Sequence, residues 1–184
     1  MVIDPRAAQT FIHGYSRLLA KIYTLSKGRA GIEVLQMLAA ARDVAIATPS
    51  IIASAASELE RIGKPVPLEV ISALNSLQLK QWVYLRDTTA YSVFLDPSGN
   101  DAYAVLGLTD RLRDILGGTG AYLRTGVVEF GGRFVCDGIV SNYVWLGTNY
   151  RKQFAAHLAM IKKMGSFHVS PTSDWRGPVS AISD

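Results

Sequence analysis

The sequence predicts an α+β protein with an N-terminal helical region, a curved, mostly antiparallel sheet that could close partway into a barrel, and a C-terminal helix. Apolar residues recur at steps of three and four over residues 4–79, which is helical spacing. From Lys80 onward, short aromatic and β-branched segments alternate with turn residues, and no long helices separate them as a Rossmann fold requires. The 184 residues therefore divide into a helical region over 1–79, a β-rich domain over 80–165 and a polar tail over 166–184.

The first helix has clear signals at both ends. Asp4 is a suitable N-cap with Pro5 in the first turn, and Lys27 followed by Gly28 gives a cationic last turn and a stop. An apolar stripe fills the interval between them. The second helix is apolar over much of its circumference, so we expect it to be well buried. The further helices of this region are expected at 30–45, 48–62 and 68–77.

The β-rich domain contains two sets of strands. Gly131 and Gly132 predict a two-residue hairpin loop within the second set, and residues 142–146 either continue its last strand or form another one. A polar tail without periodicity, typical of a mobile segment, follows the last helix. Strands are expected at 80–88, 90–96, 102–108, 121–130 and 133–140, a short helix at 109–116 and the last helix at 150–164.

Composition excludes several classes of protein. Hydrophobic residues make up 49% of the chain, which is too much for intrinsic disorder, and 19 Lys and Arg against 15 Asp and Glu give a net charge of +4 that permits an acidic partner without demanding one. The N-terminus lacks a signal-peptide pattern, and the longest apolar stretch, 44–56, is too short and too broken to cross a bilayer, so no membrane partner is expected. A single cysteine, Cys136, forms no intramolecular disulfide, and a cytoplasmic location is expected.

Three motifs with chemical potential are better explained as structure. The run 117–120 (GGTG) follows a helix and precedes a strand, the reverse of a phosphate-binding loop, so a helix stop is favoured. Cys136 and His157 could form a nucleophile and base, but alternation places the cysteine among buried residues. His13, His157 and His168 have no metal-ligand spacing. We therefore predict no catalytic residues, no metal site and no cofactor.

Asp137 is the most unusual of the polar residues. Strand alternation places it in the middle of a core-like strand, where an unpaired carboxylate would cost several kcal/mol. If the hairpin turn is at 131–132, Gly126 lies opposite Asp137 and Arg124 lies diagonal to it, within reach. A structural Arg124–Asp137 ion pair is favoured over a pair that faces a ligand, although the open space at Gly126 leaves room for something to dock.

Basic and aromatic residues are interleaved in the second half of the chain. Arginines and aromatic side chains on a sheet are what single-stranded nucleic-acid binding uses, through stacking and phosphate contacts. Acidic residues dilute the pattern, so an ordinary solvated surface is favoured over a nucleic-acid footprint. The basic residues of the nucleic-acid alternative are Arg111, Arg113, Arg151 and Lys152, and the aromatic residues are Tyr122, Tyr143, Trp145 and Tyr150.

Two segments carry a resemblance to known proteins. The runs AYAVLGLTD (102–110) and GGRFVCDGIVS (131–141) are similar to segments of an uncharacterised bacterial protein family, and the likeness extends over about 80–165, more loosely into the helical part. The resemblance implies a shared domain but no activity. It also draws attention to Arg133, Asp137 and Gly138 as a group, because a glycine at this point suits a strand bend or a close backbone approach.

The leading hypothesis is a non-catalytic binding or regulatory domain that presents Arg124, Arg133, Asp137 and Gly138 to a small-molecule ligand or partner protein. The apolar helical half could also support a homo-oligomer. The first alternative is a nucleic-acid-associated protein. The second is an enzyme whose site is assembled from residues distant in the sequence.

Overall fold

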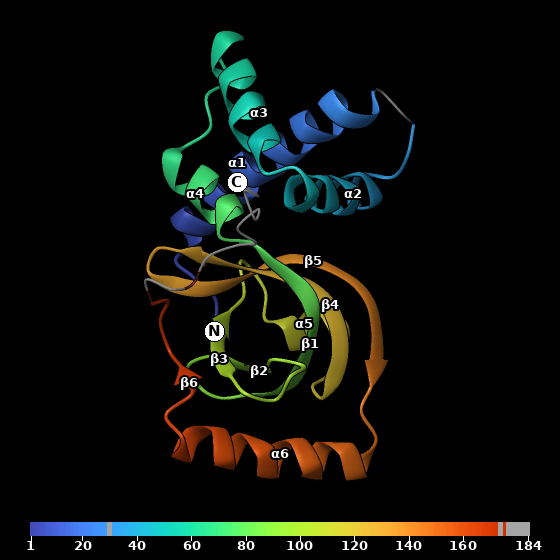
Figure 1. Ribbon diagram of the computed structural model, residues 1–184, viewed down its shortest axis with the longest axis vertical. Helices are drawn as coiled ribbons and strands as arrows, with labels where there is room; N and C mark the ends of the chain where they lie inside the picture. The colour runs from blue at the N-terminus through green and yellow to red at the C-terminus, as the bar shows by residue number, and fades with distance from the viewer. Residues whose placement is uncertain (29–30, 173–174, 176–184) are drawn as a thin grey trace, which may run out of the picture.

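The computed structural model describes residues 1–28, 31–172 and 175. Four helices form one end of the molecule, a curved sheet forms the middle, and a single long helix lies across the opposite end (Figure 1). The fold is α+β, as the sequence predicts. The four helices are α1 (Pro5–Lys27), α2 (Val34–Ala47), α3 (Ser50–Arg61) and α4 (Leu68–Asn75).

Helix α1 begins and ends where its sequence signals place it. The Oδ1 atom of Asp4 accepts hydrogen bonds from the backbone N–H groups of Arg6 and Ala7, which satisfies donors that the first turn leaves free. Gly28, with a φ of 73°, ends the helix. Helix α2 begins at Val34, later than the predicted start at residue 30, which lies outside the described residues.

The sheet is built from six strands and contains a closed ring. Strand β1 pairs with β2 and β4, β4 with β5, β5 with β3, and β3 with β2, which completes the ring of five. Within the ring only β3 and β5 run parallel. The strands are β1 (Gln78–Asp87), β2 (Ser92–Leu95), β3 (Ala102–Leu106), β4 (Ala121–Phe130), β5 (Arg133–Trp145) and β6 (Phe167–His168), with α5 (Leu112–Leu116) after β3 and α6 (Thr148–Lys163) after β5.

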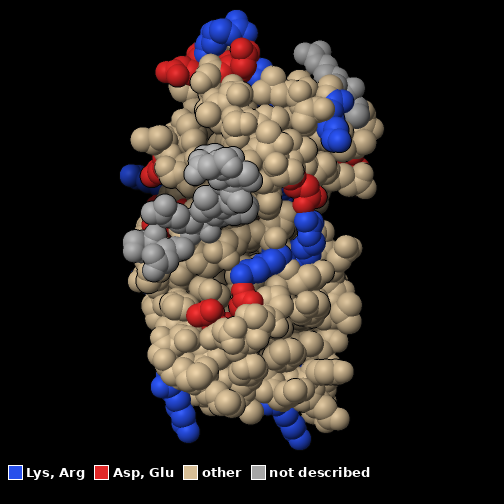
Figure 2. Space-filling view, viewed as in Figure 1, with Lys and Arg blue, Asp and Glu red and all other residues tan. Residues whose placement is uncertain are grey.

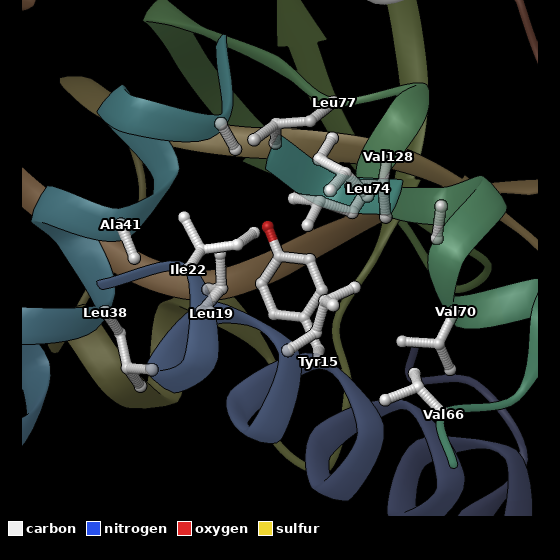
Figure 3. Packing of buried hydrophobic residues seen from close by; sticks show 14 of the residues in the cluster. Tyr15, Leu19, Ile22, Leu38, Ala41, Val66, Val70, Leu74, Leu77 and Val128 are labelled. Atoms are coloured by element: carbon white, nitrogen blue, oxygen red, sulfur yellow. The ribbon is translucent and has the colours of Figure 1, made fainter. Parts of the chain in front are cut away.

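Side chains alternate across the ring, so its two faces belong to different cores. On β1, Trp82 and Tyr84 pack inside the ring, whereas Val83 and Leu85 pack outside it against Leu158 of α6. The outer faces of β4 and β5 pack against α1–α4 instead. Figure 3 shows this helical core, with Tyr15 of α1 among aliphatic side chains. The ring is therefore covered on one side by the helical region and on another by α6.

Part of the predicted polar tail is structured. Phe167 and His168 form β6, which pairs in parallel with Ala102 and Tyr103 of β3. The indole of Trp175 is buried, and its centroid lies 4.7 Å from the centroid of the Phe134 side chain. The expectation of an unstructured tail is wrong for these residues, because their aromatic side chains join existing clusters. The rest of the tail, 173–174 and 176–184, lies outside the described residues.

The sequence left two alternatives for residues 142–146, and the structure shows the first of them, because β5 runs on to Trp145. Within the part of the chain that the structure describes, no helix combines the length and the apolar character needed to cross a membrane.

Candidate nucleic-acid interface

Asp137 is buried and forms an ion pair, but with a residue of the helical region. Nη1 of Arg42, on α2, donates to Oδ2 and Oδ1 of Asp137 at 2.7 and 3.0 Å and to the carbonyl oxygen of Ile139 at 2.9 Å. Both ionic side chains are fully buried. The prediction that a guanidinium holds this carboxylate is correct in kind, and the prediction that Arg124 supplies it is wrong.

A shift in strand register explains the error. Residues 127–130 of β4 pair with β5 in the register that the hairpin predicts. Beyond them the register changes, because Thr125 pairs with Val140 and two extra residues of β5 form a bulge at this point. Arg124 therefore lies opposite Ser141 and forms an ion pair with Asp43 of α2.

Other polar groups complete the surroundings of Asp137. The hydroxyl of Tyr15 donates to Oδ2 at 3.2 Å, and the backbone N–H of Ile139 donates to Oδ1 at 3.0 Å. Burial, and then the nearby Asp137 carboxylate, raises the pKa of Tyr15 well above its usual value. A Cβ at Gly126 would lie 2.4 Å from Oδ2 of Asp137, so the space at this glycine is filled by the carboxylate and does not receive a ligand.

The residues of the predicted ligand site do not come together. Asp137 is 4% exposed, Arg124 is paired with Asp43, and Arg133 is exposed beside the hairpin turn. Gly138, with a φ of 76°, lines two neighbouring surface hollows. Asp137 therefore joins the helical region to the ring and does not present its carboxylate to solvent.

Cys136 has the surroundings of a buried apolar residue. It packs inside the ring, and burial, together with the nearby Asp137, raises its thiol pKa to about 11. His157 lies against the turn at Gly99. Within the described residues, no three His, Cys, Asp or Glu side chains are grouped to hold a metal ion.

The glycine loop 117–120 ends α5 and lies close to two side chains from β5 and α6. Gly117 is left-handed, with a φ of 82°, and its N–H donates to the carbonyl of Arg113, so the predicted helix stop is confirmed. The indole of Trp145 lies 3.3 Å from the position of a Cβ at Gly118, and the guanidinium of Arg151 lies 2.6 Å from that of a Cβ at Gly120. These two glycines therefore allow Trp145 and Arg151 to approach the loop closely.

Trp145 lies close in the chain to other exposed aromatic and basic side chains. Tyr143 and Trp145 are 46% and 43% exposed and meet edge to face, with ring centroids 5.6 Å apart. Tyr150, in the first turn of α6, is 61% exposed, and the next two residues are basic. We call Tyr143, Trp145, Tyr150, Arg151 and Lys152 the aromatic surface. The segments that surround it, 117–123 and 142–152, contain no Asp or Glu.

The remaining predicted nucleic-acid residues lie elsewhere. Arg111 and Arg113 line a separate hollow near the end of β1, so the four basic residues divide into two pairs. Tyr122 pairs with Val144 across β4 and β5, one position along from the pair that includes Trp145 and therefore on the opposite face of the sheet.

The face shown in Figure 2 has no large patch of side chains that all carry the same charge. Basic and acidic side chains lie side by side near its middle and at the tip of the helical region, and most of the rest is uncharged. A nucleic-acid backbone requires an excess of positive charge. This face is therefore a poor candidate for such a partner.

Comparison with known proteins found no matching family model, no matching curated protein and no matching solved structure.

Proposed function

We propose that this protein is a non-catalytic domain that binds single-stranded nucleic acid through the aromatic surface. The proposal rests on one observation: Tyr143 and Trp145 form an exposed aromatic pair that approaches the glycine loop, with the Arg151 guanidinium next to the same loop. Large aromatic side chains are mostly buried in folded proteins, so a neighbouring pair that stays exposed favours a binding role. Unpaired bases stack on such rings, and cations beside them contact the phosphates.

Local charge supports this choice of partner. Arg151 and Lys152 are exposed, and no carboxylate occurs in the segments around the aromatic surface. The Nε of Arg151 donates to the carbonyl of Leu146 at 3.0 Å, which orients the side chain and leaves its terminal nitrogens for a phosphate. A protein partner of undefined chemistry has no comparable support.

The order of the strands gives weaker support. A ring in which β3 pairs in parallel with β5, and a helix follows β3, has the connectivity of the OB-fold, a five-stranded Greek-key architecture that often binds oligonucleotides. The usual binding face of that fold, on strands β2 and β3, is covered here by α6. We therefore place the nucleic acid beyond this face, where β5 ends.

A direct test measures the affinity of the protein for a labelled single-stranded oligonucleotide of about 12 nucleotides by fluorescence anisotropy at about 50 mM salt. Trp145→Ala should weaken binding roughly 5- to 150-fold, because stacking on one base contributes about 1–3 kcal/mol. Trp145→Phe keeps a ring and should retain most of the affinity. Lys152→Gln should reduce the slope of log affinity against log salt by about 0.7.

Two results would contradict the proposal. One is the absence of binding by the wild-type protein at low salt. The other is equal affinity of the wild type and Trp145→Ala, with unchanged thermal unfolding of the variant showing that it is folded.

The position of Gly138 favours a second candidate function, the binding of a small apolar molecule. It lies in the shared wall of two hollows, of about 150 and 280 Å³, which also share Ile115. Leu108 and Leu35 line one hollow each. A screen of small apolar compounds by thermal shift should find a ligand whose effect is lost in Ile115→Gln, and a screen without any stabilising compound would exclude this candidate.

A further inference from the structure

We propose that a second site, separate from the aromatic surface, binds a phosphate group between the guanidinium groups of Arg111 and Arg113. The site is a hollow of about 490 Å³ between the end of β1 and the segment that begins α5. Its volume is in the usual range for small-molecule sites. We call it the arginine hollow, and its walls are formed by Met1, Asp87, Thr88, Thr89, Arg111 and Arg113.

The two arginines have charge available for a ligand. Within the described residues Arg111 has no ion pair, and Arg113 has only a 4.0 Å contact between its Nε and Oδ1 of Asp114, with both side chains more than half exposed. An exposed contact of this length contributes little. Two cationic groups in the wall of one hollow repel each other, and an anion between them relieves that repulsion.

Asp87, which also lines the hollow, accepts hydrogen bonds from two neighbouring hydroxyl groups. Its Oδ1 accepts hydrogen bonds from the hydroxyl groups of Tyr84 at 2.8 Å and Ser92 at 2.7 Å. Burial, and then the bond to Asp87, raises the pKa of Tyr84, so this hydroxyl stays a donor at neutral pH. Among the residues that line the hollow, one carboxylate is set against two guanidinium groups, which gives the lining an excess of positive charge.

The hydroxyl groups in the wall are not equally available. The Oγ1 of Thr88 donates to the carbonyl of Tyr91 and accepts from the N–H groups of Ala90 and Tyr91, so it is occupied within its own turn. Thr89 is exposed and forms no hydrogen bond within the described residues. It is therefore the hydroxyl that a ligand can reach.

These donors suit a phosphate monoester. Guanidinium groups bind phosphate through two parallel hydrogen bonds each, and a terminal phosphate offers three oxygens for two arginines and a hydroxyl. Such a phosphate occurs in a free nucleotide and at the end of a nucleic-acid strand. The inference does not depend on the proposed function, because the two sites share no residue.

The primary test is isothermal titration with inorganic phosphate and with a nucleoside 5′-monophosphate, using the unphosphorylated nucleoside as the negative control. Both phosphate compounds should bind, and the double variant Arg111→Gln/Arg113→Gln should weaken binding at least tenfold. The matched control is Lys27→Gln/Lys64→Gln, which removes the same charge from exposed positions in the helical region. Failure of both compounds to bind, or an equal loss in the control, would overturn the proposal.

A second measurement distinguishes the sources of the phosphate and separates the two proposals. In a Trp145→Ala background, titration with inorganic phosphate should be unchanged, whatever happens to the affinity for oligonucleotides. If the hollow receives the end of a strand, a 5′-phosphorylated oligonucleotide should bind more tightly than its 5′-hydroxyl counterpart, and Arg111→Gln/Arg113→Gln should abolish the difference. If the phosphate belongs to a free nucleotide, the two oligonucleotides should bind equally while the mononucleotide still binds.

Discussion

Two neighbouring ion pairs join α2 to the ring, and they differ in their burial and in their hydrogen bonding. Arg42 and Asp43 are consecutive, and each pairs with a residue of opposite charge, Asp137 of β5 and Arg124 of β4 respectively. The first pair is fully buried, whereas the side chains of the second are 31% and 53% exposed. Burial decides what such a pair contributes, because a buried charge without its partner is costly and an exposed one is solvated.

The difference also concerns hydrogen bonding. Asp137 accepts bonds from Arg42, Tyr15 and Ile139, so its charge is shared among several donors. Two donor atoms of Arg42, Nε and Nη2, are buried and have no partner within the described residues. The buried pair therefore fixes how the helical region meets the ring, and the following predictions test how far it differs from the exposed pair.

The largest effect is expected for Asp137→Ala. It leaves the Arg42 guanidinium buried without a counter-charge, and it should lower the free energy of unfolding by about 3–5 kcal/mol, measured by urea denaturation. Arg42→Lys is the control that keeps the charge, and it should retain part of the stability because a single nitrogen, Nη1, makes the hydrogen bonds of Arg42 to Asp137 and Ile139. A loss below about 1 kcal/mol for Asp137→Ala would make the two ion pairs equivalent.

Gly126→Ala should have the next largest effect. The added methyl group would lie 2.4 Å from Oδ2 of Asp137 and 2.6 Å from Cδ1 of Leu77, so the packing around the carboxylate must shift. We expect a loss of about 1–3 kcal/mol in urea denaturation, which is typical of overpacking. Gly131→Ala is not a matched control, since the φ of Gly131 is positive, but Gly31→Ala meets open space at a position without a positive φ and should be nearly neutral. Equal stabilities of the two alanine variants would show that the carboxylate is not confined.

Tyr15→Phe removes one donor to Asp137 and should cost about 1–2 kcal/mol at neutral pH. Its pH dependence is a sharper test. The pKa of Tyr15 is raised in the folded state, so the phenol favours folding below its unfolded pKa of about 10, and this contribution is lost as the pH rises toward the folded value. The wild type should therefore lose more stability than Tyr15→Phe between about pH 10 and 12, as followed by circular dichroism. Parallel pH profiles of the two proteins would contradict the assignment.

The smallest effect is expected for Arg124→Ala. The exposed pair with Asp43 should contribute no more than about 1 kcal/mol, and less at high salt. A double-mutant cycle with Asp43→Ala measures the coupling directly. A coupling as large as that of the buried pair would show that exposure does not separate the two.

The sequence predicted the order and type of the elements well because those depend on local signals. The cap at Asp4, the hairpin at Gly131 and Gly132, and the helix stop at Gly117 are each encoded within a few residues. The closure of the ring was only suggested, because the pairing of β5 with β3 depends on curvature that no local pattern specifies.

The partner of Asp137 could not be predicted in the same way. Arg42 is 95 positions away in the sequence, and the register shift near Gly126 moved the expected partner, Arg124, out of reach. One signal was available: Arg42 and its neighbour Asp43 are the two charged residues of a largely apolar helix that was expected to be buried. The burial of Trp175 was harder to predict, since its neighbours in the sequence are mostly polar.

The dipeptide at 42–43 also constrains the angle at which α2 can dock. Successive residues of a helix are about 100° apart around its axis, so turning α2 by one position in one direction would bring Asp43 toward Asp137, and turning it in the other direction would bring Arg42 toward Arg124. Either turn would replace an attraction with a repulsion between like charges. The opposite charges of these two neighbouring residues thus favour a single rotational orientation of α2 against the ring.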